Sequence, residues 1–87
     1  MSESSTTGAG GGDGLVLDCR AMRCPAPIIE LGKNLTRVPV GELIGVAATD
    51  VAARVDVPAF CRLRAQEYAG ETTAEDGVPI FWVRRLS

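Results

Sequence analysis

The spacing of apolar residues predicts a strand and then a helix at the start of the patterned part of the chain. Apolar and polar side chains alternate through residues 15–20, which is typical of a half-buried strand. Ile28, Leu31 and Leu35 then recur at helical spacing. We therefore expect a helix over about residues 25–36. Prolines are tolerated in its first turn because the N–H groups there have no partner within the helix.

A second strand and a second helix follow in the middle of the chain. Residues 42–48 are almost all apolar, as in a strand that is buried on both faces. Apolar residues then recur at helical spacing up to Tyr68. Pro58 must lie early in this helix, because a proline in a helix interior removes a hydrogen bond. The helix therefore starts either after Asp56, or at Asp50 as N-cap with a kink at the proline.

Two short strands close the pattern. Gly70 is the expected end of the second helix, and residues 71–74 form a short strand. Asp76 and Gly77 make a turn, after which residues 80–83 form a strand with apolar side chains on both faces. The order of elements is strand, helix, strand, helix, strand, strand. It favours an α+β fold, a two-layer α/β sandwich with a four-stranded mixed sheet and both helices on one face.

The first 14 residues differ in composition from the rest of the chain. They hold five of the ten glycines and one large apolar residue, Met1, so they bury too little apolar surface to offset the entropy of ordering. We predict a disordered tail over residues 1–14 and one domain over residues 15–87. The formal net charge of −2 resides in the tail. Removing Glu3 and Asp13 from the eleven acidic residues leaves nine, which equals the nine Lys and Arg.

Composition excludes several classes of function. The chain has no histidine, which removes Ser–His–Asp and Cys–His catalytic sites, and its three cysteines are one too few for an all-cysteine zinc site. No apolar run approaches the roughly 18 residues that cross a membrane. A neutral domain without a basic stripe argues against direct nucleic-acid binding. An odd number of cysteines, with no segment of signal-peptide character, indicates a reducing cytoplasm.

The three cysteines have different predicted environments. Cys19 lies on the inner face of the first strand and Cys61 on the apolar stripe of the second helix, so both are expected in the core. Cys24 directly precedes the first helix, where its sulfur would lie near unsatisfied N–H groups and the positive end of the helix dipole. Arg20 and Arg23 would add positive charge if they reach the sulfur. We therefore expect a thiol pKa below the ordinary value of about 8.5.

An activated thiol of this kind lacks the other parts of an enzyme. The sequence offers it no histidine base, no phosphate-binding loop and no set of metal ligands. Such a thiol suits one task, the acceptance of an atom or group from a partner and its transfer onward. The alternative is that Cys24 is structural and only tolerates the start of a helix.

The segment over residues 18–27 resembles the Cys-Pro-x-Pro signature of the TusA/SirA sulfur carrier proteins. The likeness extends over residues 15–85 and includes the Val-Pro-Ala-Phe-Cys segment of the second helix and the closing turn. The motif stands between the first predicted strand and the first predicted helix, and its residues here are Cys24, Pro25, Ala26 and Pro27.

The resemblance implies a cytoplasmic protein that carries sulfur as a persulfide on Cys24, without a resident cofactor. It also implies that Pro25 and Pro27 shape the site, and our electrostatic argument adds Arg23. The implied donor is a cysteine desulfurase or a rhodanese. The implied acceptor is a downstream protein of tRNA thiolation or of cofactor and sulfur metabolism. A carrier of this kind is a relay rather than a self-sufficient enzyme, and we expect a monomer.

Three positions depart from the familiar form of the family. Ala21 and Met22 stand where Gly and Leu are common, and Ala26 stands where some members have Glu. The last change alters the charge beside the motif, so the choice of partner is expected to differ. The alternative function is a regulatory or protein-interaction module in which Cys24 has a structural role.

Overall fold

The computed structural model describes residues 14–87, so the predicted disordered tail lies outside the described residues except for Gly14. The predicted order of elements is confirmed, and a short 3-10 helix, η2, extends the first helix. The elements are β1 (Leu15–Asp18), α1 (Ala26–Asn34), η2 (Leu35–Arg37), β2 (Leu43–Ala47), α2 (Ala53–Arg64), β3 (Glu67–Thr73) and β4 (Pro79–Arg84).

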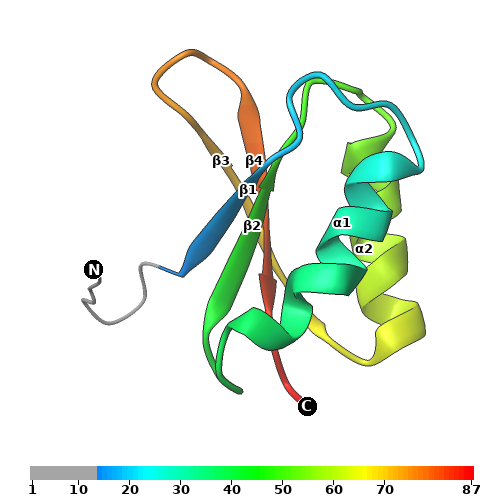
Figure 1. Ribbon diagram of the computed structural model, residues 1–87, viewed down its shortest axis with the longest axis vertical. Helices are drawn as coiled ribbons and strands as arrows, with labels where there is room; N and C mark the ends of the chain where they lie inside the picture. Colours follow the sequence, from blue (N-terminus) through cyan, green and yellow to red (C-terminus); the bar gives the residue numbers. More distant parts are fainter. Residues whose placement is uncertain (1–13) are drawn as a thin grey trace.

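The four strands form one mixed sheet in the order β1-β2-β4-β3. β1 and β2 are parallel, because α1 returns the chain to the same end of the sheet, and the other two pairings are antiparallel. Both helices lie on the same side of the sheet (Figure 1). The predicted two-layer α+β architecture with a four-stranded mixed sheet is therefore confirmed.

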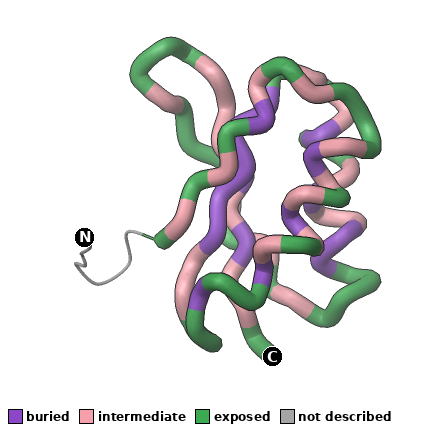
Figure 2. Tube along the Cα trace, in the orientation of Figure 1, coloured by how far each residue is buried: buried purple, intermediate pink, exposed green. Residues whose placement is uncertain are grey.

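The core lies between the sheet and the two helices. The central strand β2 is buried almost throughout, which accounts for its nearly continuous apolar sequence (Figure 2). Its inward side chains face those of β4 and the apolar sides of both helices, so one compact core holds the layers together. The largest side chains with almost no exposure are Leu31, Ile44, Val46, Val57, Phe81 and Val83.

The second helix begins and ends at residues other than those predicted. It begins at Ala53, between the two proposed starts, so Pro58 lies inside it. It ends at Arg64, because Ala65 adopts a left-handed conformation with φ of 56° and donates its N–H to the Cys61 carbonyl. The prediction that Gly70 ends the helix is wrong, since this glycine lies within β3.

The strand predicted over residues 71–74 is correspondingly longer and starts at Glu67. Tyr68, which the helical spacing placed on the second helix, packs against the core from β3 instead. Two residues further on, Gly70 has φ of 103° next to a register shift in the β3–β4 pairing, a conformation that favours glycine. The misplacement of Tyr68 has a physical cause, because a strand residue and a helix residue can both supply the same apolar contact.

The sheet face away from the helices carries the single tryptophan. Trp82 pairs with Gly45 across β2 and β4, and its indole Nε1 donates to Thr72 Oγ1 at 2.7 Å. A methyl group on Gly45 would approach the indole ring to 2.9 Å, so glycine is what lets the ring lie against the sheet. Phe81 is buried and Trp82 half-buried, which confirms a last strand with apolar side chains on both faces.

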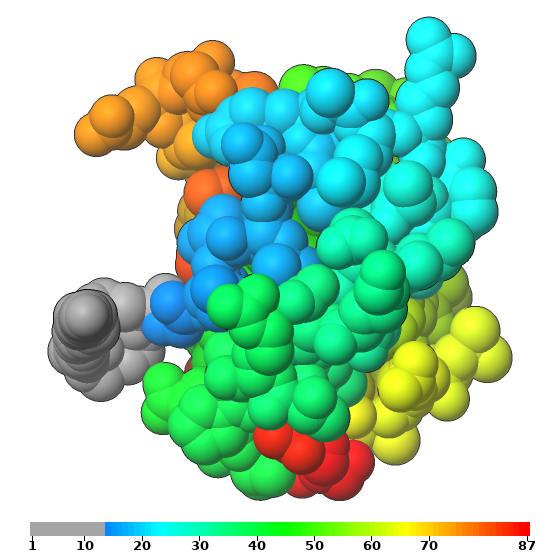
Figure 3. All heavy atoms as spheres, in the orientation of Figure 1, coloured from blue at the N-terminus to red at the C-terminus, as the bar shows by residue number. Residues whose placement is uncertain are grey.

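Two contacts between distant segments close the ends of the domain. At one end Arg20, in the loop after β1, pairs with Asp18 and with Asp76 of the β3–β4 hairpin. At the other end the C-terminal residues lie against residues 38–42 (Figure 3), and the Arg85 backbone N–H donates to the Glu42 carbonyl at 3.0 Å. Within residues 14–87, no helix has the length and apolar character needed to cross a bilayer.

Candidate functional site

The three cysteines differ sharply in exposure, as predicted. Cys19 is 1% and Cys61 3% exposed, whereas Cys24 is exposed in the loop between β1 and α1. Burial raises the pKa of the Cys61 thiol to about 11, and burial is also the main reason that the pKa of Cys19 is raised. Two of the three thiols are therefore inert core groups, and Cys24 is the one that a partner can reach.

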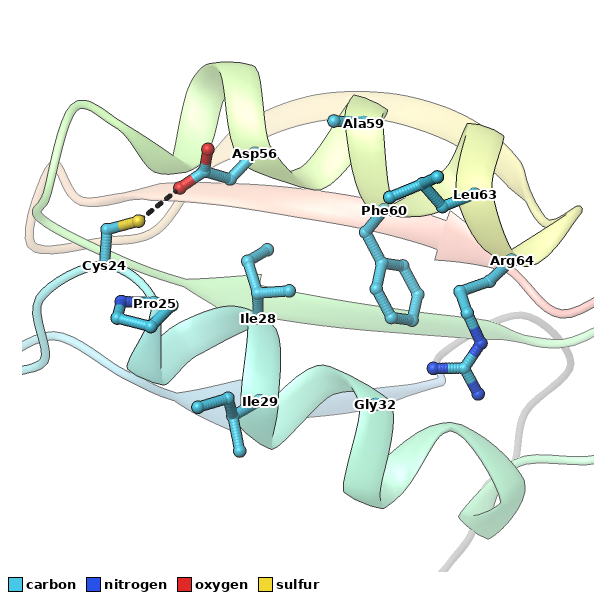
Figure 4. Close-up of a pocket in the computed structure, with 10 residues that line it drawn as sticks. All are labelled: Cys24, Pro25, Ile28, Ile29, Gly32, Asp56, Ala59, Phe60, Leu63 and Arg64. Atoms are coloured by element: carbon cyan, nitrogen blue, oxygen red, sulfur yellow. Dashed lines mark hydrogen bonds between the residues drawn. The ribbon is translucent and has the colours of Figure 1, made fainter.

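Two aspartates hold Cys24 in place. Its backbone N–H donates to Asp50 Oδ2 at 2.9 Å, and its Sγ donates to Asp56 Oδ2 at 2.8 Å (Figure 4). The other oxygen of Asp50 accepts the N–H of Ala52, the residue before α2, at 3.0 Å. Asp50 therefore joins the loop that carries the thiol to the start of the second helix.

The expected lowering of the Cys24 pKa is wrong. The hydrogen bond to Asp56 raises the pKa of the thiol, and removal from solvent and the negative charges of Asp56 and Asp50 raise it further. The thiolate would lie beside two carboxylates, so the neutral thiol is the favoured form.

The start of α1 does not supply the expected N–H groups to the sulfur. Pro25 is the N-cap and Pro27 lies in the first turn, and neither has an N–H to donate. The Ala26 N–H donates to the Arg23 carbonyl at 2.7 Å, and the Ile28 N–H donates to the Pro25 carbonyl at 3.1 Å. The prolines that shape this turn therefore also remove donors that would have stabilised a thiolate.

The two arginines expected to act on the sulfur act on carboxylates instead. Arg20 forms its ion pairs with Asp18 and Asp76, on the side of the loop near the β3–β4 hairpin. Arg23 is exposed. The hydrogen bonds that Asp50 accepts are the main reason that its pKa is lowered, and the charge of Arg23 is a smaller contribution in the same direction. Neither arginine contributes to the pKa shift of Cys24.

An apolar groove of about 550 Å³ runs between α1 and α2, with Cys24 at one end (Figure 4). Ile28 and Phe60 point toward one another between the two helices in this view, while Ile29 and Leu63 line the outer part of the groove. Ile29 is 54% and Leu63 85% exposed, so the groove presents apolar side chains to solvent.

The far end of the groove carries a positive charge. The Arg64 guanidinium lies over the Phe60 ring, 5.3 Å from its centre, in a cation–π arrangement. A methyl group on Gly32 of α1 would lie 3.5 Å from Arg64 Nη1, an ordinary contact distance, so the arginine side chain reaches across the groove to α1. The groove therefore runs from a thiol between carboxylates at one end to a guanidinium at the other.

The structure brings together some of the predicted site residues and adds others. Cys24 and Pro25 both line the groove, whereas Pro27 is fully buried beneath it and fixes the start of α1 in the core. Asp50 was predicted only as a helix cap, and the role of Asp56 was missed. Asp56 lies 32 residues from the thiol that it binds, so no local spacing in the sequence could have paired them.

The comparisons with known proteins point to one family. Residues 15–85 match the family described as sulfurtransferase TusA. A sulfur carrier protein TusA from Pseudomonas syringae pv. syringae is 37% identical over 71 residues, which is 82% of this chain and 83% of that protein. Proteins of the same name from Pseudomonas savastanoi pv. phaseolicola and Pseudomonas fluorescens are 36% identical over 70 residues and 32% identical over 71 residues. These alignments cover 80% and 82% of this chain, and 82% and 84% of the two relatives.

Proposed function

The chain belongs to the TusA family, and from this membership we propose that it is a sulfur carrier that holds sulfur as a persulfide on Cys24. The observation that supports the assignment of the residue is exposure: among the three cysteines, only Cys24 is accessible, and it lies at the end of an apolar groove. The family match includes this position, since it covers residues 15–85.

The chemistry of loading balances without an external oxidant. The Cys24 sulfur attacks the outer sulfur of a persulfide on the donor, R–S–S–H. The donor's S–S bond breaks as a new S–S bond to Cys24 forms, and the Cys24 proton ends on the departing sulfur. The products are a Cys24 persulfide and the donor thiol, so one sulfur atom moves and no electrons are gained or lost overall. Delivery is the same exchange with the Cys24 persulfide as the donor and a thiol of the acceptor as the attacking group.

The groove suits a carrier that must meet two partners in turn. It offers exposed apolar side chains beside the thiol, where a partner can dock and exclude water during the exchange. We propose that the donor is a cysteine desulfurase or a rhodanese. The proposed acceptor is a protein of tRNA thiolation or of cofactor and sulfur metabolism. Exposed free thiols are kept reduced in the cytosol, so we propose that the protein works in the cytoplasm, without a resident cofactor.

Intact-mass measurement tests this proposal. The protein is incubated with a cysteine desulfurase, pyridoxal phosphate and L-cysteine, and its mass is measured without reductant. We expect the gain of one sulfur atom in the wild-type protein, in Cys19→Ser and in Cys61→Ser, and no gain in Cys24→Ser. A sulfur that also appears on Cys24→Ser would refute the assignment to Cys24.

The same measurement separates the carrier from the alternative module. If Cys24 has only a structural role, no labile sulfur accumulates on any variant, and Cys24→Ser unfolds at a lower temperature than the wild type. A thermal melt of Cys24→Ser therefore accompanies the mass measurement. The carrier proposal expects normal folding of this variant together with complete loss of loading.

A further inference from the structure

The carboxylate beside Cys24 has a feature that the sulfur carrier role does not by itself require. Among residues 14–87, no ion pair joins Asp56 to an arginine or lysine, and the hydrogen bond that it accepts comes from the Cys24 thiol. Two other aspartates at this end of the domain have backbone or arginine partners. Asp50 accepts two backbone N–H groups, and Asp76 is paired with Arg20.

We propose that Asp56 is a positioning residue that holds the proton on Cys24 in the empty carrier and selects partners that bring a positive charge to the sulfur. This inference rests on the proposed function, because it concerns which donors load Cys24. The expected partner presents a persulfide or disulfide sulfur that has a cationic side chain next to that sulfur.

The geometry favours this selection at both stages of the exchange. Before contact, the Sγ–Oδ2 hydrogen bond of 2.8 Å points the thiol at Asp56 and favours its neutral form, which is a poor nucleophile. On contact, a cation from the partner pairs with the unpaired carboxylate. The negative charge that favoured the proton is then compensated, so the Cys24 thiol ionises more readily and its proton ends on the departing donor sulfur.

The other charged groups near the thiol either add negative charge or contribute nothing to the pKa shift of Cys24. From the loop before α2, Asp50 adds a second negative charge on the backbone side of Cys24. Arg23, in the same loop as the thiol, contributes to lowering the pKa of Asp50. From α2, Arg64 lies over Phe60 at the opposite end of the groove. An incoming cation therefore meets a net negative site at Cys24.

Two small disulfides of opposite charge serve as probes. Cystamine is cationic and dithiodipropionate is anionic, and each forms a mixed disulfide with Cys24 while releasing one thiol equivalent. The wild-type protein is expected to react faster with cystamine. In Asp56→Asn the ratio of the two rates is expected to fall about two- to fivefold, which is the effect of one exposed charge pair. The charge-conserving Asp56→Glu is expected to retain most of the preference.

A second readout follows the proton itself. The rate of alkylation of Cys24 by neutral iodoacetamide is measured against pH, and the midpoint is expected to fall in Asp56→Asn because the carboxylate that opposes ionisation is gone. Glu75→Gln makes the same change in net charge at an exposed residue of the β3–β4 hairpin that contributes nothing to the pKa shift of Cys24, and it is the matched control.

The inference is overturned if the midpoint of Asp56→Asn stays at the wild-type value or rises. It is equally overturned if the preference for cystamine falls as much in Glu75→Gln as in Asp56→Asn. Cystamine, dithiodipropionate and iodoacetamide contain no persulfide, so these results do not depend on whether Cys24 is a sulfur carrier. Failure of the carrier proposal appears instead as absence of loading by the desulfurase.

Discussion

Replacement of Gly45 by alanine tests how the sheet holds its single tryptophan. The added methyl group would lie 2.9 Å from Ile80 Cγ2 and 2.9 Å from two carbons of the Trp82 ring. Carbon atoms in favourable contact lie about 3.5–4.0 Å apart, so the ring must move by several tenths of an ångström. Overpacking of this kind costs about 1–3 kcal/mol.

Two further effects set the net magnitude. Movement of the indole weakens its 2.7 Å hydrogen bond to Thr72, which contributes about 0.5–1.5 kcal/mol. In the opposite direction, alanine is favoured over glycine within a strand by about 0.5–1 kcal/mol. We therefore expect Gly45→Ala to lower the free energy of unfolding by about 1–2 kcal/mol, which is about 5–10 °C in Tm for a domain of this size.

Urea unfolding followed by fluorescence measures this change, because Trp82 is the only tryptophan in the chain. The Gly45→Ala and Trp82→Leu double mutant, followed by circular dichroism, is expected to lose less stability than the sum of the single changes. The rate of Cys24 alkylation is expected to stay unchanged, since Gly45 faces away from the helices. A Gly45→Ala protein as stable as the wild type would refute the packing argument.

Three further predictions concern the thiols, the ion pairs and the core. Native protein treated with N-ethylmaleimide is expected to gain one adduct, on Cys24, and two more only after unfolding in urea, as read by intact mass. Arg20 lowers the pKa of Asp18 and Asp76, so its stabilisation is present above the ordinary carboxyl pKa and is lost as pH falls through the lowered values. Arg20→Ala is therefore expected to have a lower urea midpoint at neutral pH and a smaller further fall in acid. Leu31→Ala, which empties a fully buried position, is expected to cost about 2–5 kcal/mol in urea unfolding, and a cost below about 1 kcal/mol would contradict the placement of this residue in the core.

The sequence was sufficient to predict the fold because its apolar pattern carries most of the information. The continuous apolar run of β2 marked the buried centre of the sheet, and the alternation in β1 correctly placed Cys19 inward. The end of α2 could not be predicted in the same way. Ala65 takes a left-handed conformation that the sequence signals only weakly, and Tyr68 supplies a core contact from either a helix or a strand.

The site was predictable in position but not in its electrostatics. The Cys-Pro-x-Pro segment located the thiol, yet the groups that set its pKa come from another part of the chain. Asp56 lies 32 residues away and reaches the sulfur only because α1 and α2 pack side by side on the sheet. The start of α1 does not stabilise a Cys24 thiolate as expected, because Pro25 and Pro27 stand at two of the positions whose N–H groups would do so.

The location of the transferred sulfur tests the central claim most directly. Cleavage after lysine and arginine places each cysteine on a different peptide, and Cys24 lies on the peptide over residues 24–33, between the cleavage sites after Arg23 and Lys33. The protein is loaded by a desulfurase from L-cysteine that contains a heavy sulfur isotope, blocked with iodoacetamide and digested. The account predicts one heavy sulfur atom on the peptide over residues 24–33 and none on the peptides of Cys19 and Cys61. Heavy sulfur on either of those two peptides, or on none of the three, would contradict it.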